Sequence, residues 1–263
     1  MPRRTVLEIG QWQGSGSVTA RRLVAGAAEL AAFVPGDKRV RVSVSSKSDK
    51  SALVDNLAAA RAALVDRPEV IVGGDCGVEV APIEAALAAH GDGLVVVWFD
   101  AHGDLNTPES SPSGAFHGMV LRTLLGSGFP EISPLRTLRP AQVVLAGVRA
   151  LDPAEKEYVE EAGLAHVEPA ALGTLTSVVA GLDAKALYLH IDLDVLDPSL
   201  FAAVGTPEPE GVTPDQLIAA VRELTTRFPI AGVGITEYEP DRPEDRAVLA
   251  RLVPALFSDE PSR

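Results

Sequence analysis

The 263-residue chain has a single cysteine and no long hydrophobic segment. With Cys76 alone, an intramolecular disulfide is excluded. The longest apolar run, around residues 94–99, is far too short to span a bilayer. The first residues, MPRRTVLEIGQWQG, contain no apolar run of the length that a secretory signal needs. We therefore expect a cytoplasmic protein without a membrane partner.

Basic residues are also scarce relative to acidic ones. The chain has 23 Lys and Arg against 36 Asp and Glu, a formal net charge of -13. An acidic chain repels nucleic-acid phosphates and anionic lipids, so neither is expected as a partner. The acidity suits a cationic substrate, but surface acids also serve solubility alone. Hydrophobic residues make up 46% of the chain, enough for a large core without disulfide support.

Short segments rich in β-branched residues alternate with longer segments of helical composition. The predicted strands read TVLEIG, RVRVSVS, EVIVGG, LVVVWFD, QVVLAGV, ALYLHIDLD and IAGVGITEY. The predicted helices span residues 19–32, 51–65, 78–90, 116–125, 153–162, 214–228 and 242–256. This alternation predicts a parallel sheet with helices on both faces. Because no linker or repeat divides the chain, we predict one domain over residues 1–263.

Acidic residues follow four of the predicted strands. They are Asp75 with Cys76, then Asp100, His102 and Asp104, then Asp192, Asp194 and Asp197, and finally Glu237 and Glu239. Ligands of open parallel sheets bind beyond the carboxyl ends of the strands. The sequence therefore predicts that these side chains meet along one edge of the sheet.

The spacing of these acids favours a metal site. Residues two apart in an extended segment point to the same side, so Asp100, His102 and Asp104 can converge, as can Asp192 and Asp194. Their mutual repulsion would force some to protonate, whereas divalent cations would keep them ionised. Oxygen ligands with one imidazole favour manganese or a similar metal. Two such ions about 3.5 to 4 Å apart can share and activate a water molecule.

Other polar residues fit ordinary structural roles. Asp75 and Asp197 are expected to form turns or caps, with Asp197 shaping the turn before Pro198. His90 precedes a glycine at the predicted end of a helix and is expected to cap it. His166 and His190 are interpreted as structural.

Five ordered motifs resemble those of the ureohydrolase family, and of arginase more than agmatinase. GGDCG resembles GGDHS, DAHGDLNTPESSPSGAFHG resembles DAHxDxNTP…SGNxHG, GVRALDP resembles GxRDxDP, HIDLDVLDPS…GTP resembles SIDxDxxDP…GTP, and TEYEP resembles ExNP. The resemblance implies a three-layer α/β/α fold with an eight-stranded, mostly parallel sheet. It also implies a trimer or hexamer with a binuclear manganese centre that converts guanidino compounds to urea and an amine.

The resemblance assigns metal-binding roles to six positions. Asp100 and Asp192 would bridge two Mn²⁺ ions, Asp104 would bind the first, and His102 and Asp194 the second; Cys76, at the position of a histidine ligand, would be an unusual further ligand of the first. A metal-bridging hydroxide would attack the guanidinium carbon. Asp104 would pass a proton to the leaving amine.

Further positions match residues that contact the substrate. His117 would shuttle protons, while Glu237 would pair with the guanidinium group, supported by Thr206. Asn106 and Ser113 match positions that contact an α-carboxylate, and Asp152 matches one that contacts an α-amino group. Asn106 and Ser113 are also ordinary in a polar loop, and Asp152 could simply cap the next helix.

Four positions depart from the family motifs. Cys76 stands where the family has a histidine ligand, Ala115 where it has an asparagine, Ala150 where it has an acid, and Glu239 where it has an asparagine. As a thiolate, Cys76 would shift the metal preference toward zinc, iron or cobalt. As a buried neutral thiol, it would leave the first metal weakly bound.

The motifs therefore predict a metal-dependent ureohydrolase with L-arginine as the favoured substrate and L-ornithine and urea as products. Two alternatives stay open. One is an active enzyme for agmatine, guanidinobutyrate or formiminoglutamate. The other is a catalytically impaired relative that binds a cationic amino acid or serves as a structural subunit.

Overall fold

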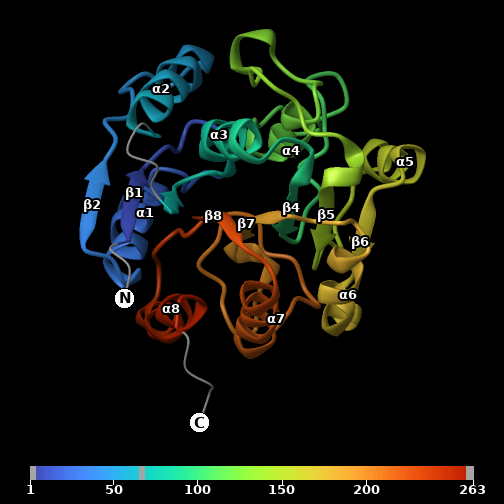
Figure 1. The fold of residues 1–263 in the computed structure, drawn as a ribbon. Helices are drawn as coiled ribbons and strands as arrows, with labels where there is room; N and C mark the ends of the chain where they lie inside the picture. The colour runs from blue at the N-terminus through green and yellow to red at the C-terminus, as the bar shows by residue number, and fades with distance from the viewer. Residues whose placement is uncertain (1–3, 65–68, 259–263) are drawn as a thin grey trace.

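The computed structural model describes residues 4–64 and 69–258, which form an α/β fold around one eight-stranded sheet (Figure 1). The strand order is β2-β1-β3-β8-β7-β4-β5-β6. All pairings between these strands are parallel, so the expected sheet is confirmed. The strands are β1 (Thr5–Ile9), β2 (Lys38–Arg41), β3 (Val70–Gly73), β4 (Leu94–Phe99), β5 (Val143–Ala146), β6 (Ala165–Val167), β7 (Ala186–Asp192) and β8 (Ile230–Thr236).

Burial explains the composition of the central strands. Every residue of β3, β4 and β7 is buried, because helices cover both faces of the sheet. Such strands are near-continuous runs of Val, Ile and Leu rather than alternating patterns. A polar residue inside one of them is therefore conspicuous, and His190 in β7 is fully buried.

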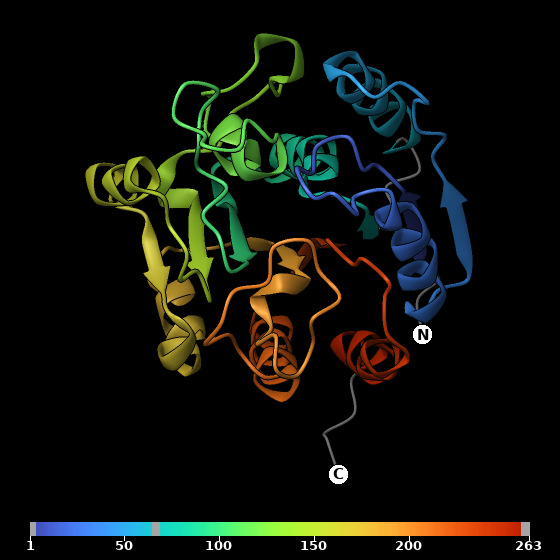
Figure 2. The same ribbon diagram turned by 180° about the vertical axis from the view of Figure 1, so that it is seen from behind.

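Two layers of helices enclose the sheet (Figures 1 and 2). One apolar cluster joins α1, α6, α7 and α8 to one face, and a second joins α2, α3, α4 and α5 to the other. The helices are α1 (Arg22–Phe33), α2 (Lys50–Ala63), α3 (Val80–His90), α4 (Val120–Leu124), α5 (Pro153–Ala162), α6 (Leu175–Ala180), α7 (Pro214–Arg227) and α8 (Pro243–Leu256). The three-layer α/β/α arrangement is thus confirmed.

Local signals in the sequence set several helix ends. Thr213 caps α7 by accepting a hydrogen bond from the backbone N–H of Gln216, and Pro214 occupies the first turn. At the C-terminal end of α5, Gly163 has a φ of 65° and terminates the helix in the left-handed conformation that glycine adopts at low cost.

The seven predicted strands and seven predicted helices are all present, with shifted ends. The expected helix over 116–125 is a 3₁₀ turn, η4 (His117–Met119), followed by the short α4. The helix expected from residue 19 begins three residues later, and Val65 at the expected end of another lies outside the described residues. Strand β6 and helix α6 were not predicted, because three and six residues are too short for a periodic pattern.

The four acid-bearing strand ends are neighbours in the sheet. β3, β8, β7 and β4 are consecutive, and all run in the same direction. Their carboxyl ends therefore deliver the acidic residues to one edge, as the sequence predicts. Within residues 4–64 and 69–258, none of the helices has the length and apolar content to cross a membrane.

Candidate metal centre and active-site pocket

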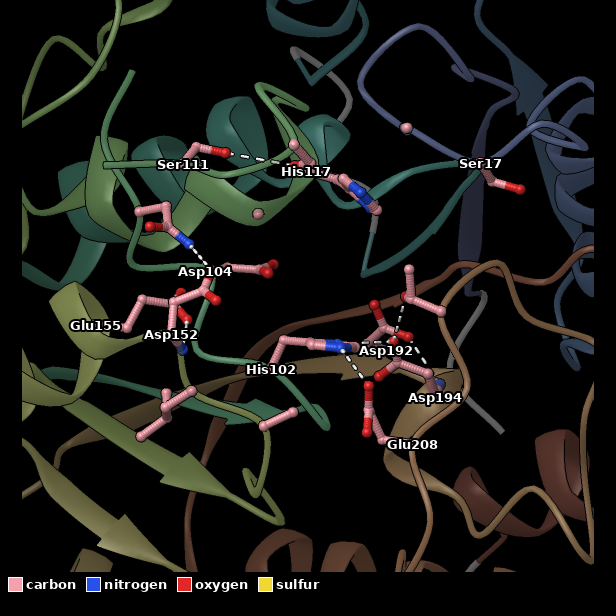
Figure 3. A pocket seen from close by; sticks show the side chains of 17 residues that line it. Ser17, His102, Asp104, Ser111, His117, Asp152, Glu155, Asp192, Asp194 and Glu208 are labelled. Carbon is pink, nitrogen blue, oxygen red and sulfur yellow. Dashed lines mark hydrogen bonds and ion pairs between the residues drawn. The ribbon is translucent and has the colours of Figure 1, made fainter. Parts of the chain in front are cut away.

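A cavity of about 450 Å³ opens at this edge of the sheet (Figure 3). It brings together nine of the residues that the sequence singles out: His102, Asp104, Asn106, Ser113, His117, Asp152, Asp192, Asp194 and Thr206. Asp104, Asp152 and Glu155 lie on one side of His102 in this view, and Asp192, Asp194 and Glu208 on the other. Cys76, Asp100 and Glu237 are buried and do not line the cavity.

The loop after β4 carries the first group of possible metal ligands. His102 Nδ1 lies 3.0 Å from Asp194 Oδ2 and 3.5 Å from Asp100 Oδ1. The backbone N–H of His102 and the indole N–H of Trp98 both donate to the Asp100 carboxylate. Ligand atoms of Asp100, His102 and Asp194 all lie within 4.8 Å of one another, which is close enough to hold one cation.

A second group lies deeper, between β7 and the 3₁₀ turn η2 (Cys76–Glu79) that follows β3. It consists of Cys76, Asp100, His190 and Asp192, again with ligand atoms within 4.8 Å of one another. The thiol of Cys76 donates to Asp192 Oδ2 at 3.1 Å. Asp100 belongs to both groups, so it stands where a bridging ligand would stand.

Asp104 belongs to neither group, although it lines the cavity. Its Oδ2 atom has no hydrogen-bond partner in the described part of the chain. Asp104 and Glu237 have φ angles of 50° and 65°. Non-glycine residues seldom adopt this left-handed conformation, and such strain concentrates at functional sites. The fold therefore holds both carboxylates in place at an energetic cost.

The carboxylate cluster is electrostatically unfavourable by itself. Burial, together with the charge of Asp194, raises the pKa of Asp100 to about 6. Burial and neighbouring carboxylates likewise raise the pKa values of Asp104 and Asp192 well above the ordinary range. For Asp194 burial acts in the same direction, but His102 outweighs it and lowers the pKa.

Divalent cations would remove this penalty, and the donor set suits them. Buried acids, one or two imidazoles and a thiol are all metal ligands. The Oδ2 atom of Asp104 lacks a protein partner among the described residues, which leaves it free to face a cation or its water. The residues present therefore fit a pair of divalent cations.

His117 and Glu237 form a pair beside the metal ligands. His117 Nδ1 lies 3.2 Å from Glu237 Oε1, and the same oxygen accepts a hydrogen bond from the backbone N–H of Cys76 at 3.0 Å. Burial disfavours the charged imidazolium, but the carboxylate of Glu237, together with the charges of Asp75 and Asp194, outweighs burial and raises the pKa of His117. His117 lines the cavity, whereas Glu237 does not.

The opposite wall holds the residues expected to contact an amino acid end. Asn106 Nδ2 donates to Asp152 Oδ2 at 2.8 Å. The backbone N–H of Asp152 donates to Glu155 Oε2, so Asp152 also belongs to the N-terminal cap of α5. Ser113 accepts a hydrogen bond from the backbone N–H of Ala115 and has an exposed side chain. Thr206 Oγ1 donates to Asp194 Oδ2 at 3.1 Å.

The residues interpreted as structural lie where such roles require. Asp75 accepts hydrogen bonds from the backbone N–H groups of Gly77 and Gly14 and caps η2. Asp197 accepts one from Ser199 in the turn after β7. His90 is the last residue of α3, and His166 Nε2 lies 2.9 Å from the carbonyl oxygen of Val148.

Sequence reasoning missed three ionisable residues at this edge. Glu208 Oε1 lies 3.9 Å from His102 Nε2, Glu155 accepts from the backbone N–H of Leu105, and Glu79 is fully buried beside His190. No motif pointed to them, because they come from loops and helices rather than from strand ends. The interpretation of His190 as structural overlooks its spacing, because a residue two before Asp192 lies on the same side of β7 as that predicted ligand.

The fold and the pocket together define an α/β/α protein with a carboxylate-rich candidate metal centre. The model of the family described as "Arginase family" matches residues 18–257. An arginase of Bacillus caldovelox is 34% identical in an alignment 244 residues long that covers 86% of this chain and 79% of that protein. The chain therefore belongs to the arginase family and is a hydrolase of that family.

Solved structures share the fold at lower identity. An Entamoeba histolytica arginase, crystallised with L-ornithine, has a TM-score of 0.85 and 20% identity, covering 97% of this chain and 98% of that one. A formimidoylglutamase of Bacillus subtilis has a TM-score of 0.73 and 19% identity, covering 97% and 85%. A putative agmatinase of Clostridium difficile has a TM-score of 0.74 and 21% identity, covering 97% and 95%. Fold alone thus does not define the substrate.

Proposed function

We propose that the chain hydrolyses a guanidino compound with an amino acid end, with L-arginine as the favoured substrate and L-ornithine and urea as products. The observation that carries the proposal is the composition of the pocket. Its base holds the carboxylate cluster, and its wall holds the hydrogen-bonded pair Asn106 and Asp152. A cationic guanidinium group is attracted to the base, while the wall offers partners for an α-carboxylate and an α-amino group.

In this proposal the six predicted ligands hold two divalent cations, with Mn²⁺ expected in the oxygen-rich position. Cys76, Asp100, Asp104 and Asp192 would hold the first cation, and Asp100, Asp192, His102 and Asp194 would hold the second. When bound, the cations supply Lewis acidity and lower the pKa of a nucleophilic water toward neutrality.

Glu237 would bind the guanidinium group of the substrate, and His117 would transfer protons. His117 stands between the cavity and Glu237, at the position of a counter-ion for that carboxylate. A substrate guanidinium would take over this position as His117 moves aside, because both are planar cations with N–H donors. His117 would then carry protons between the pocket and solvent.

Asp104 is positioned to move a proton within the pocket. Its Oδ2 atom has no hydrogen-bond partner in the described residues, and its side chain lines the cavity. A carboxylate that lines the pocket can accept a proton and release it to a leaving amine. We assign Asp104 this transfer to the amine of the product.

Two observations favour rival functions. Ala115 offers no side-chain donor to an α-carboxylate, which favours substrates without one, such as agmatine, or with a carboxylate placed differently from that of arginine, such as guanidinobutyrate or formiminoglutamate. A neutral Cys76 would weaken the binding of the first metal. This favours a catalytically impaired relative that only binds a cationic amino acid or serves as a structural subunit. We propose a cytoplasmic trimer or hexamer in either case, which light scattering after gel filtration would test.

The test is urea release from purified protein loaded separately with Mn²⁺, Co²⁺ or Zn²⁺. Substrates are L-arginine, agmatine and guanidinobutyrate, with formiminoglutamate followed by formamide release. Asp100→Ala removes a shared ligand, and Asp183→Asn, at an exposed site, is the matched control. Activity highest on L-arginine, lost in D100A and kept in D183N, supports the proposal. A preference for another compound would identify that compound, rather than L-arginine, as the substrate. No turnover with any metal would support the catalytically impaired relative.

A further inference from the structure

His190 is a fully buried histidine inside β7, a strand that is buried along its whole length. Its partner in the neighbouring strand β4 is Trp98, and the two rings stack with centroids 3.6 Å apart. Stacking fixes the plane of the imidazole, because the indole is itself held by its hydrogen bond to Asp100. The ring therefore presents its two nitrogens in fixed directions.

One nitrogen faces the predicted ligands of the first metal. His190 Nε2 lies 3.6 Å from Cys76 Sγ, and Cys76 Sγ lies 3.1 Å from Asp192 Oδ2. A tetrahedral ion with a metal–sulfur distance of about 2.3 Å and a metal–nitrogen distance of about 2.05 Å separates these two atoms by about 3.6 Å. The sulfur and nitrogen atoms thus already have the spacing of two ligands of one ion.

The other nitrogen faces a buried carboxylate. His190 Nδ1 lies 3.7 Å from Glu79 Oε1, and both side chains are fully buried. Across the described chain, neither this nitrogen nor either oxygen of Glu79 has a hydrogen-bond partner. A small rotation would join them. Metal-bound histidines characteristically donate their second N–H to a carboxylate, which fixes the tautomer and strengthens the ligand.

The sheet makes room for this carboxylate. Gly234 in β8 pairs with His190, and a Cβ atom at this glycine would lie 1.6 Å from Glu79 Oε1. Any other residue at 234 would therefore displace Glu79. A buried carboxylate beside a buried imidazole whose Nδ1 atom has no hydrogen-bond partner is costly in a merely structural role, since apolar side chains would fill the space at lower cost.

We propose that His190 is a ligand of the first metal, together with Cys76, Asp100 and Asp192, and that Glu79 orients it. This set of sulfur, nitrogen and two carboxylates selects zinc, cobalt or iron over manganese. The second group, Asp100, His102 and Asp194, is richer in oxygen and suits manganese. The two sites would therefore differ in metal preference, and Asp104 would be left to move protons. The inference rests on the proposed function only in treating the pocket as a two-metal centre.

The absorption spectrum of bound Co²⁺ shows directly whether the Cys76 thiolate is a metal ligand. We would titrate metal-free protein with Co²⁺ and follow the sulfur-to-cobalt charge-transfer band in the near ultraviolet. One equivalent should produce the band in the wild type, and Cys76→Ser should abolish it. His190→Gln should shift the band and weaken cobalt binding at least about tenfold. His166→Gln, a substitution of a histidine away from the pocket ligands, should match the wild type.

A second measurement covers the case in which H190Q does not fold. Glu79→Gln preserves the size of the side chain and leaves every proposed ligand in place. It should keep the band but weaken binding at the thiolate site by about tenfold, because the histidine loses its charged partner. Elemental analysis after dialysis against equal Zn²⁺ and Mn²⁺ should find about one thiolate-bound Zn²⁺ per folded wild-type chain.

These readouts separate this inference from the proposed function, since none depends on urea release. A wild type with no charge-transfer band, or one that retains only manganese after the competition, would overturn the assignment of the first site. Wild-type cobalt affinity and spectrum in both H190Q and E79Q would show that His190 is structural. A clear band without hydrolysis of any guanidino compound would retain the metal assignment and reject the proposed function.

Discussion

The imidazole of His117 is held against the carboxylate of Glu237, with 3.2 Å between Nδ1 and Oε1. The same Oε1 atom accepts a hydrogen bond from the backbone N–H of Cys76. Three segments that carry site residues therefore meet at one oxygen atom: the turn after β3, the loop before α4 and the end of β8. Glu237 therefore links His117 to the backbone of a proposed metal ligand, Cys76.

The first prediction concerns the charge on His117. Glu237→Gln should lower the pKa of His117, because burial disfavours the imidazolium and Glu237 supplies the largest opposing contribution. A raised pKa stabilises the folded protein below the unfolded value of about 6.5, and this stabilisation is lost as pH rises through the folded pKa. The pKa can be measured by NMR of the His117 ring protons in metal-free protein.

Glu208→Gln is the matched control, since Glu208 faces His102 rather than His117. It should leave the His117 pKa near the wild-type value. An unchanged pKa in E237Q would mean that the two side chains are not paired in solution. The E237Q protein should also show a weaker loss of stability as pH rises through this range.

The second prediction separates the two ends of the substrate. Asp152→Asn keeps an oxygen that can accept the hydrogen bond from Asn106 but removes the charge that would bind an α-amino group. The KM for L-arginine should rise about tenfold or more, the usual loss for a hydrogen bond to a charged group. The KM for guanidinobutyrate, which has no α-amino group, should change little.

Ser113→Ala provides the crossed experiment. It should weaken the binding of L-arginine and guanidinobutyrate, which carry a carboxylate. The binding of agmatine, which has none, should not change. Equal effects of D152N and S113A on all three compounds would show that these positions do not recognise the amino acid end.

Much of this site was readable from the sequence because its residues follow strands. A run such as VVVWFD marks a buried strand, and its end in a parallel sheet marks the site edge, so Asp100, Asp192 and Glu237 could be placed together before the structure was known. The spacing of two between Asp192 and Asp194 likewise predicts a common side.

What the sequence could not supply is register between distant segments. Cys76 and His190 are 114 residues apart, and only the pairing of β3 with β8 and β8 with β7 brings them together. A histidine inside a strand has the pattern of a core residue, so its nitrogens could not be assigned a direction. The positive φ angles of Asp104 and Glu237 also follow from the loops that hold them, not from residue type.

The third prediction is that Asp104 lowers the stability of the metal-free protein while it supports turnover. Asparagine tolerates the left-handed backbone of this position and removes one charge from the repelling cluster. In metal-free protein at neutral pH, Asp104→Asn should raise the Tm by about 2–4 °C, the shift that about 1 kcal/mol produces in a chain of this size. Turnover of the metal-loaded enzyme should fall at the same time.

Calorimetry of chelator-treated protein measures the first effect, and the substrate assay measures the second. Asp183→Asn is a suitable control, because Asp183 also has a positive φ, at 54°, but is exposed and remote from the cluster. A D104N protein with an unchanged or lowered Tm would show that the cluster does not destabilise the fold.

The last prediction exchanges the two residues that distinguish the first metal site. Cys76 Sγ lies 3.2 Å from Thr236 Oγ1 and 3.6 Å from His190 Nε2, so an imidazole at position 76 has no room while His190 is present. Cys76→His alone should therefore bind Mn²⁺ no better than the wild type and should be destabilised, since overpacking costs about 1–3 kcal/mol. The double variant C76H/H190S relieves the crowding and restores the histidine and serine of the motifs GGDHS and SID. Isothermal titration should show tighter Mn²⁺ binding in the double variant than in the wild type, C76H or H190S, and cobalt should give no thiolate band. If C76H gained as much Mn²⁺ affinity as C76H/H190S, the two positions would be independent, and His190 would not share a metal with residue 76.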